Sequence, residues 1–239
     1  MANEVISPDR LRTSKSYPIW QAARLANVTP QTARKWLLGY EGTYGPVAPV
    51  FGDRERRSPG ASQVLMLSFV ELVELAVVAR FRKRPRPIKI DRIRDAHTFA
   101  RNDFGLEYPF ASIKLLQWGG HIVHQFPELN PSYPSDAVAL DMQGQPTLPG
   151  MVTFELKHNL VFSERDPFAE RWYPRGRETP IVVDPAVAAG RPSIDGTGVT
   201  IATVMARWKS GEKIRELSRD YDIPRETLEL VLQVADAAA

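Results

Sequence analysis

The chain has 239 residues, of which 43% are hydrophobic and 25% are charged, a balance typical of a globular protein of one or two domains. It contains no cysteine, which excludes disulfides and thiolate metal sites. The N-terminus lacks the apolar run of a signal peptide and stretches such as 75–79 are too short to span a bilayer, so we expect a cytoplasmic protein with no membrane partner.

The net charge of +3 conceals an uneven distribution along the chain. Residues 1–94 contain 17 Lys and Arg against 8 Asp and Glu, whereas residues 95–239 contain 14 against 20. The basic half suits a polyanion and the acidic half suits a different partner. The alternative is that the asymmetry is incidental.

Two short helices are expected after a loose polar arm over residues 1–15. Apolar residues at helical spacing predict the first helix over about 18–26. Thr29 suits an N-cap and Pro30 a first-turn position, which predicts a second helix that ends near Gly39.

The following stretch predicts a β-hairpin with a long basic tip. Two strand-like pieces, 47–51 and 64–67, flank the turn-prone segment 52–60. Ser68 suits the N-cap of a long apolar helix over roughly 69–83.

Another helix is expected over 88–103, and residues 105–174 are the least regular part of the chain. The last segment begins with an apolar run and a glycine-rich loop, and its periodicity predicts three short helices. These helices are expected near 200–209, 213–221 and 225–235.

The predicted fold is therefore mainly α with small β elements. We expect a winged helix–turn–helix with its following helices over 1–100, a mixed α/β region over 101–174 and a helical, helix–turn–helix-like domain over 175–239.

The helix–turn–helix predicts DNA binding, because its second helix carries polar and basic residues opposite an apolar face. The polar set is Gln31, Thr32, Arg34 and Lys35, and the packing set is Ala33, Trp36 and Leu37. Gln pairs with adenine and Arg with guanine in the major groove. Phosphate contacts are expected from the basic tip, at Arg54, Arg56 and Arg57. The alternative is an ordinary helical hairpin with a solvated basic face.

Residues 17–36 resemble the MerR-type winged helix–turn–helix. The matching residues are Tyr17-Pro18-Ile19-Trp20-Gln21-Ala22-Ala23-Arg24-Leu25-Ala26-Asn27-Val28-Thr29-Pro30-Gln31-Thr32-Ala33-Arg34-Lys35-Trp36. The resemblance implies that base and phosphate contacts come from Thr29 to Lys35. Trp36 stands where an aromatic residue is common in that family, and we expect it to be part of the core.

A basic run follows the long apolar helix. Its members are Arg80, Arg82, Lys83, Arg84, Arg86, Lys89, Arg92 and Arg94. Such a run either extends a phosphate-binding surface or forms a solvated joint between two helices, and the sequence favours neither reading.

The C-terminal quarter resembles domain-of-unknown-function family 433, which is grouped with VapB-type antitoxins. The matching pieces are Val183-Asp184-Pro185, Gly190-Arg191-Pro192-Ser193-Ile194-Asp195-Gly196-Thr197-Gly198-Val199, Arg207-Trp208-Lys209-Ser210-Gly211-Glu212, Glu216-Leu217 and Asp220-Tyr221-Asp222-Ile223-Pro224-Arg225-Glu226-Thr227. The resemblance implies a VapC-like toxin partner with a PIN-type ribonuclease fold, which this chain binds and silences.

The residues of the tail favour a contact with protein over one with DNA. Its glycine-rich loop lacks the Gly-Lys-Ser/Thr of a phosphate-binding loop and reads as a turn before a helix. Residues 175–239 hold 9 Lys and Arg against 10 Asp and Glu, less positive than a DNA-reading unit. DNA reading by this segment stays the alternative.

A toxin that gathers carboxylates around a metal is best blocked by a cation with apolar anchors around it. Within the tail the candidate toxin-binding residues are Arg191, Arg207, Trp208 and Arg215. Trp208 is equally consistent with a core position. The middle region offers a second set, Trp118, Phe126, Arg171 and Trp172.

No catalytic or cofactor-binding pattern is evident, and we expect neither an enzyme nor a metalloprotein. His121 and His124 are close in sequence but lack a third ligand nearby. The expectation is an antitoxin of a type II toxin–antitoxin system that represses its own operon as a dimer or larger, with the helix at 69–83 and the C-terminal helices as candidate interfaces. The alternatives are a MerR-like regulator whose C-terminal domain binds another protein or ligand and, more distantly, a nucleic-acid-processing enzyme.

Overall fold

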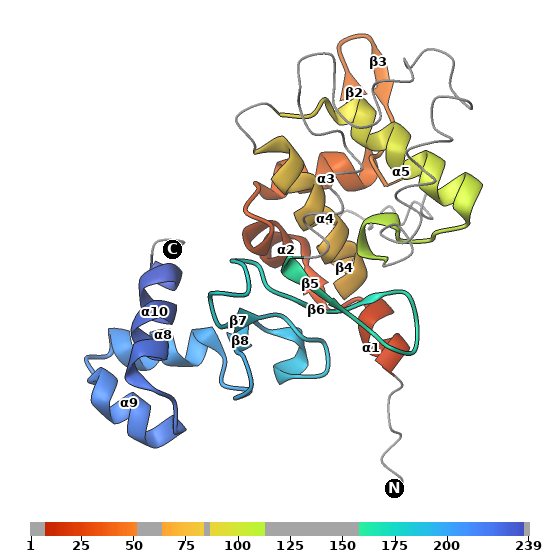
Figure 1. Ribbon diagram of the computed structural model, residues 1–239. Coiled ribbons are helices and arrows are strands. Elements are labelled where there is room, and N and C mark those ends of the chain that lie inside the picture. Colours follow the sequence, from red (N-terminus) through yellow and green to blue (C-terminus); the bar gives the residue numbers. More distant parts are fainter. Residues whose placement is uncertain (1–7, 52–63, 84–86, 113–157, 237–239) are drawn as a thin grey trace, which may run out of the picture. The chain divides into compact units, whose positions relative to one another are not determined.

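The computed structural model describes residues 8–51, 64–83, 87–112 and 158–236 (Figure 1). The chain divides into two compact units. The C-terminal unit comprises Met1–Arg12, His158–Val161 and Glu170–Ala239, and the N-terminal unit comprises Thr13–Lys157 and Phe162–Ala169. The basic tip, most of the irregular middle region (residues 113–157) and the histidines His121 and His124 lie outside the described residues.

The structure confirms a mainly α protein with small β elements. Most elements of the N-terminal unit precede residue 112. They are β1 (Tyr17–Pro18), α2 (Ile19–Leu25), α3 (Pro30–Leu38), β2 (Tyr40–Gly42), β3 (Gly45–Val47), β4 (Met66–Leu67), α4 (Phe69–Arg82), α5 (Ile90–Phe104) and the 3-10 turn η1 (Pro109–Ala111). The two helices expected at 18–26 and from Pro30 are confirmed, as are those at 69–83 and 88–103.

The polar arm is not loose throughout, because α1 (Pro8–Thr13) is a short helix. Its Arg12 is buried, with 3% of the residue exposed. Six residues make less than two helical turns, which is too short for an apolar period to be visible in the sequence.

Helix α4 forms the centre of the N-terminal unit. Ser68 and Glu71 close a capping box at its start, in which Glu71 Oε2 accepts from the Ser68 amide at 2.7 Å. Twelve of its fourteen residues are buried, so the helix is covered on nearly all sides, and it contacts η1 and α2. α4 was a candidate dimer interface, but twelve of its side chains are buried within the single chain, so the helix offers little surface to a second copy.

The expected hairpin between 47–51 and 64–67 is also wrong. β3 pairs with β2 in antiparallel register, with Val47 opposite Tyr40. β4 pairs with β1, with Leu67 opposite Tyr17. The chain reverses immediately after α3 because Gly39 adopts φ +74°, where a Cβ atom would lie 2.4 Å from the Val47 carbonyl oxygen.

The C-terminal unit places short strands before a three-helix core. Besides most of α1, its elements are β5 (Leu160–Phe162), β6 (Ala169–Trp172), β7 (Ile181–Val182), η3 (Ala188–Gly190), β8 (Ser193–Ile194), α8 (Ile201–Lys209), α9 (Ile214–Tyr221) and α10 (Arg225–Asp236). The last residue of β5, Phe162, and the first residue of β6, Ala169, belong to the N-terminal unit. Ile181 pairs with Ile194, and Trp172 bridges to Val183. The three helices expected after residue 200 are confirmed.

One apolar cluster joins the strands and helices of this unit. Its buried members are Ile181, Ile194, Val204, Leu217, Ile223, Leu228, Val231 and Leu232. Thr200 caps α8 by accepting from the Thr203 amide at 3.1 Å. Asp222, with φ 54°, reverses the chain between α9 and α10, so these two helices form a second helix–turn–helix arrangement. None of the described helices has the length and apolar character needed to cross a membrane.

Candidate functional sites

The first candidate site is the helix–turn–helix formed by α2 and α3. Thr29 caps α3: its hydroxyl oxygen accepts from the Thr32 amide at 3.1 Å, and its own hydroxyl donates to Thr32 Oγ1 at 2.9 Å. The turn is closed by the Val28 amide, which donates to the Ala23 carbonyl at 2.8 Å. The Thr29 side chain is thus used to cap α3. This cap sets the direction in which the helix begins.

The polar face of α3 is exposed and carries positive charge. Gln31, Arg34 and Lys35 are exposed, whereas Thr32 is half-buried. On the opposite side Ala33 is buried, and the two further residues of the packing set, Trp36 and Leu37, are half-buried. The helix contains no carboxylate, so its exposed face suits a polyanion.

Two tyrosines on the β2–β3 hairpin extend this face. The Lys35 ammonium lies 4.9 Å from the centre of the Tyr40 ring, which joins α3 to β2 by a cation–π contact. Tyr44, between β2 and β3, is completely exposed. Sequence reasoning missed both residues, because it placed the hairpin at 47–67. The Gly-Thr-Tyr-Gly turn at 42–45 is the signal that locates it.

The segment after the hairpin, residues 49–51, is held by α3 and α5. The Val50 amide donates to the Trp36 carbonyl at 2.7 Å, and Arg94 Nε donates to the Pro49 carbonyl at 3.2 Å. From the next turns of α5, Arg101 donates to the Phe51 carbonyl at 3.3 Å. Arg94 therefore serves the joint between elements, as does Arg82, which donates to the Ile88 carbonyl at 2.7 Å. Two members of the basic run, Arg84 and Arg86, lie outside the described residues.

A buried polar pair lies beneath this segment. Glu74 of α4 and His97 of α5 are fully buried, with His97 Nε2 3.0 Å from Glu74 Oε1. The Phe110 amide donates to the same carboxylate oxygen at 3.3 Å. The His97 ring makes edge contacts with Phe51 and Phe110. Buried polar groups need such partners, so the pair fixes α4, α5 and residue 51 relative to one another.

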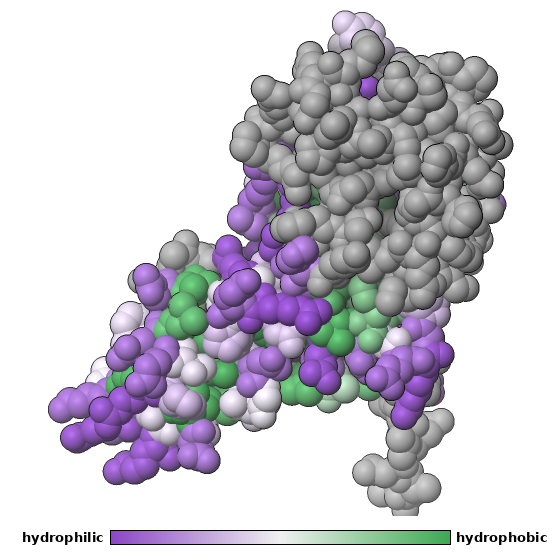
Figure 2. Space-filling model, in the orientation of Figure 1, coloured by the Kyte–Doolittle hydropathy of each residue, from purple (hydrophilic) through white to green (hydrophobic). Residues whose placement is uncertain are grey.

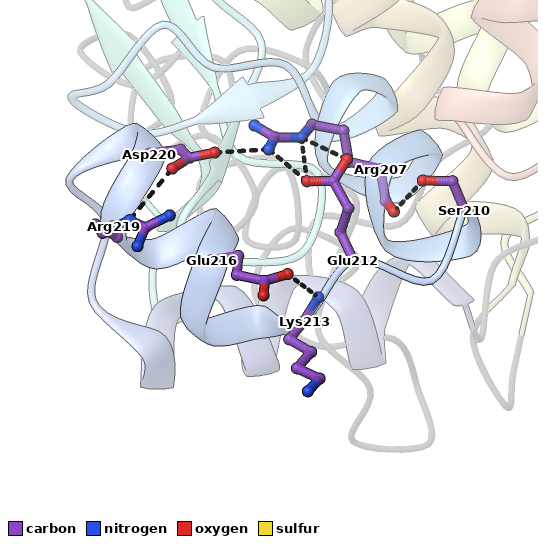
Figure 3. Close-up of polar contacts among 7 residues, drawn as sticks. All are labelled: Arg207, Ser210, Glu212, Lys213, Glu216, Arg219 and Asp220. Carbon is purple, nitrogen blue, oxygen red and sulfur yellow. Dashed lines mark hydrogen bonds and ion pairs between the residues drawn. The ribbon is translucent and has the colours of Figure 1, made fainter.

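The second candidate site lies in the C-terminal helices and centres on Arg207 (Figure 3). Arg207 Nε contacts both carboxylate oxygens of Glu212, at 2.9 and 2.8 Å, and Nη2 contacts Asp220 Oδ2 at 2.7 Å. The guanidinium lies 5.0 Å from the centre of the Tyr221 ring. One cation of α8 is thus shared by the α8–α9 turn and the end of α9.

These contacts shift the pKa values of Arg207 and of the two carboxylates. Hydrogen bonds to Glu212, and then to Tyr221 and Asp220, raise the pKa of Arg207 above its usual range. Hydrogen bonding to Arg207 lowers the pKa of Glu212 and that of Asp220. Because two carboxylates already compensate its charge, Arg207 is less suited than an exposed arginine to approach the carboxylates of another protein.

The other candidate toxin-binding residues differ in exposure. Trp208 is half-buried and packs against the apolar core. Arg191 and Arg215 are exposed. Arg191 Nε donates to the Ala188 carbonyl at 3.0 Å in a turn where Ala188 and Ala189 both have positive φ. The structure therefore leaves Arg191 and Arg215 as the exposed cations of the predicted set.

Of the second set of partner-binding candidates, in the middle region, the structure describes Arg171 and Trp172. Trp172 is buried, and Arg171 is half-exposed with its Nε 3.4 Å from Asp184 Oδ2. The next residue, Tyr173, donates its hydroxyl to Asp195 at 2.9 Å, and desolvation together with this carboxylate raises the tyrosine pKa. Trp118 and Phe126 lie outside the described residues.

The fold and these sites define a mainly helical protein of two units whose tail is a recognised domain. Residues 181–234 match DUF433, a family described as a protein of unknown function. This match confirms the resemblance of the C-terminal quarter. It does not extend to residues 17–36, so their MerR-type resemblance stays a prediction.

Two individual proteins resemble most of the chain. A Mycobacterium tuberculosis (strain ATCC 25618 / H37Rv) protein named "Putative antitoxin VapB45" is 25% identical over 220 residues, which is 89% of this chain and 90% of that protein. The X-ray crystal structure of Rv2018 from Mycobacterium tuberculosis superposes with a TM-score of 0.66 at 22% identity, over 92% of this chain and 99% of the other. The first likeness favours an antitoxin role, and the second shows a shared fold.

Proposed function

We propose that this chain is an antitoxin that neutralises a PIN-type ribonuclease toxin and represses its own operon. The similarity over most of the chain to a protein named as an antitoxin carries the proposal. A DUF433 domain at residues 181–234 supports it. In this proposal the N-terminal unit binds operator DNA and the C-terminal unit binds the toxin.

Operator binding is assigned to α3 and to the hairpin that follows it. Gln31, Arg34 and Lys35 present donors to base edges, and Tyr44 at the tip of the hairpin reaches the neighbouring backbone. In this proposal the Thr29 cap, hydrogen-bonded to the half-buried Thr32, fixes the end of α3 that enters the groove. Arg54, Arg56 and Arg57 stay in the proposal as phosphate contacts.

Toxin binding is assigned to the C-terminal unit, with Arg191 and Arg215 as the cations directed at the toxin's carboxylates. Both are exposed, whereas Arg207 is held by Glu212 and Asp220. In this proposal Arg207 orders the α8–α9 turn and thereby positions Arg215 in the first turn of α9. Trp208 supports the same surface from the core side.

The experiment is co-expression of the full chain with the product of the neighbouring gene, followed by pull-down and an RNA cleavage assay. The antitoxin proposal predicts a stable complex and suppressed cleavage. Arg191→Ala with Arg215→Ala is expected to weaken neutralisation by about 2–5 kcal/mol if either cation pairs with a buried carboxylate. Arg175→Ala, on an exposed arginine of the loop before β7, is the control.

The proposal also includes a dimer or larger assembly, since helix–turn–helix proteins commonly bind paired half-sites. Light scattering at micromolar concentration, with and without operator DNA, tests it. A monomer under both conditions contradicts a dimeric repressor, and absence of a complex with the neighbouring gene product contradicts the antitoxin role.

A further inference from the structure

Helix α2 leaves its tryptophan exposed to solvent. Trp20 is 58% exposed, whereas Ala23 of the same helix is fully buried. The Ile19 amide donates to the Leu65 carbonyl at 2.8 Å, and Val64, the residue before Leu65, is 59% exposed. Two large apolar side chains are thus exposed next to one backbone hydrogen bond. Exposed apolar groups that lie together commonly belong to a contact with a partner.

The surface that carries Trp20 is positively charged. Arg24 is exposed one helical turn after Trp20, so the two residues share one face of α2. Residues 13–40 contain four Lys and Arg and no Asp or Glu. One of the four, Lys15, forms an ion pair with Glu71 of α4, and the other three are exposed. This surface is therefore complementary to a polyanion.

The exposed face of α2 leads into the exposed start of α3, against which α2 packs (Figure 1). The Asn27 amide donates to the Arg24 carbonyl at 3.1 Å, which places Arg24 at the turn between the two helices. Thr29 and Gln31, after this turn, are exposed. In a helix–turn–helix the second helix enters the major groove and the first crosses the backbone beside it. Trp20 and Arg24 are about 6 Å apart along the axis of α2, close to the rise of two nucleotides of one strand.

We propose that Trp20 and Arg24 contact the sugar–phosphate backbone of DNA at the edge of the groove that α3 enters. Arg24 pairs with a phosphate, while the Trp20 ring packs on a neighbouring deoxyribose and its indole N–H donates to a phosphate oxygen. The inference rests on the proposed operator binding and extends the DNA-binding surface from α3 to α2. Contacts of this kind position the protein on the duplex without reading its sequence.

A second copy of the chain is the competing occupant of this surface. In a two-fold contact the same surface meets itself, so Arg24 would approach Arg24 of the second copy. Residues 13–40 supply no carboxylate to compensate these like charges. The apolar area of Trp20 and Val64 is also far below the roughly 800 Å² per partner of a standard interface. DNA instead offers a phosphate to Arg24 and an apolar sugar face to Trp20.

The test measures binding of the full chain to two labelled duplexes, the promoter region of its own operon and a duplex of the same composition in shuffled order. Trp20→Ala is expected to raise the Kd about 5-fold for both duplexes, because a backbone contact does not depend on sequence. It is expected to leave the salt dependence unchanged, since no charge is lost. Arg24→Ala is expected to raise the Kd similarly and to reduce the salt slope by about 1.

Matched controls remove similar groups from the C-terminal unit. Leu230 is an exposed apolar residue of α10, and the surface of α8–α10 turned toward the viewer in Figure 2 is mostly hydrophilic. Arg175 is exposed in the loop before β7. Leu230→Ala and Arg175→Ala are each expected to change the Kd less than about 2-fold. Trp20→Phe keeps a ring to pack on the sugar and is expected to weaken binding less than Trp20→Ala, and thermal melts confirm that each variant is folded.

The outcomes separate this inference from the proposed function. If Arg34→Ala with Lys35→Ala weakens binding but neither Trp20→Ala nor Arg24→Ala does, α3 binds DNA and the inference is overturned. It is also overturned if the α2 variants weaken binding to the operon duplex alone, or if the controls weaken it as much. A lower mass of Trp20→Ala by light scattering would assign the surface to a second copy instead. If the wild-type chain binds neither duplex, the proposed operator binding and the inference fail together.

Discussion

Arg207 and Glu212 form a two-point ion pair in which one guanidinium contacts both oxygens of a single carboxylate. The four residues between them span the end of α8 and the turn into α9. Asp220, near the end of α9, accepts from the same guanidinium. The pair therefore holds α8 and both ends of α9 through one side chain.

This network predicts an acid-sensitive contribution to stability. Arg207 lowers the pKa of Glu212 and Asp220 below their ordinary values of 4.5 and 3.8. A lowered folded-state pKa means that the stabilisation is present above these values and is lost as the pH falls below them. We expect the melting temperature of wild type to fall more steeply than that of Arg207→Ala between about pH 5 and pH 3. Equal slopes would show that the network contributes nothing to folding.

The buried pair of Glu74 and His97 predicts a large cost for removing the carboxylate. Glu74→Leu leaves the Phe110 amide and the imidazole without their shared acceptor, at about 1–3 kcal/mol for each buried group. Glu74→Gln keeps an acceptor oxygen and is expected to cost less. Urea unfolding of the full chain measures both variants, and a neutral Glu74→Leu would contradict this account.

The joint between α3 and the hairpin predicts that residue 39 must be glycine. Gly39→Ala combines a left-handed φ with a Cβ atom 2.4 Å from the Val47 carbonyl oxygen, and we expect a destabilisation of about 1–3 kcal/mol. Gly105→Ala is the control, because its φ is +61° but nothing lies within 4 Å of the added atom. Equal losses of unfolding free energy in the two variants would show that the backbone shifts to remove the close contact with the Val47 carbonyl oxygen.

Removal of the basic side chains from the exposed face of α3 is expected to lower operator affinity. Arg34→Ala with Lys35→Ala is expected to weaken binding by about 1–3 kcal/mol if either residue makes a good base contact. The arginines 54, 56 and 57 are expected to change the salt dependence instead, because phosphate contacts release counterions. Gel-shift titrations at several salt concentrations distinguish the two effects, and an unchanged affinity for the double variant ends the assignment of α3.

Substitution of Tyr44 is expected to change DNA binding without changing the stability of the fold. Its side chain is completely exposed, so Tyr44→Ala is expected to leave the free energy of unfolding within about 0.5 kcal/mol. If the hydroxyl donates to a phosphate, Tyr44→Phe and Tyr44→Ala weaken operator binding alike. A wild-type affinity in both variants would remove the hairpin tip from the interface.

The sequence by itself determined most of the helices, since their signals lie within one helical turn. Ser68 with Glu71, Thr29 with Thr32, and the apolar spacing after Thr200 each act over about four residues, and the helices begin where these residues predict. The long DUF433 motif likewise identified the tail, because it is carried by contiguous residues.

Only the tertiary structure decided which distant segments meet. β4 pairs with β1 across 49 intervening positions, with Leu67 opposite Tyr17, and local pattern could not distinguish this partner from the nearer strand at 47–51. Arg207 and Arg215 looked equivalent as cations, yet one is held by two carboxylates and the other is exposed. The charge available to a partner depends on packing between helices, and α-helical periodicity alone does not specify that packing.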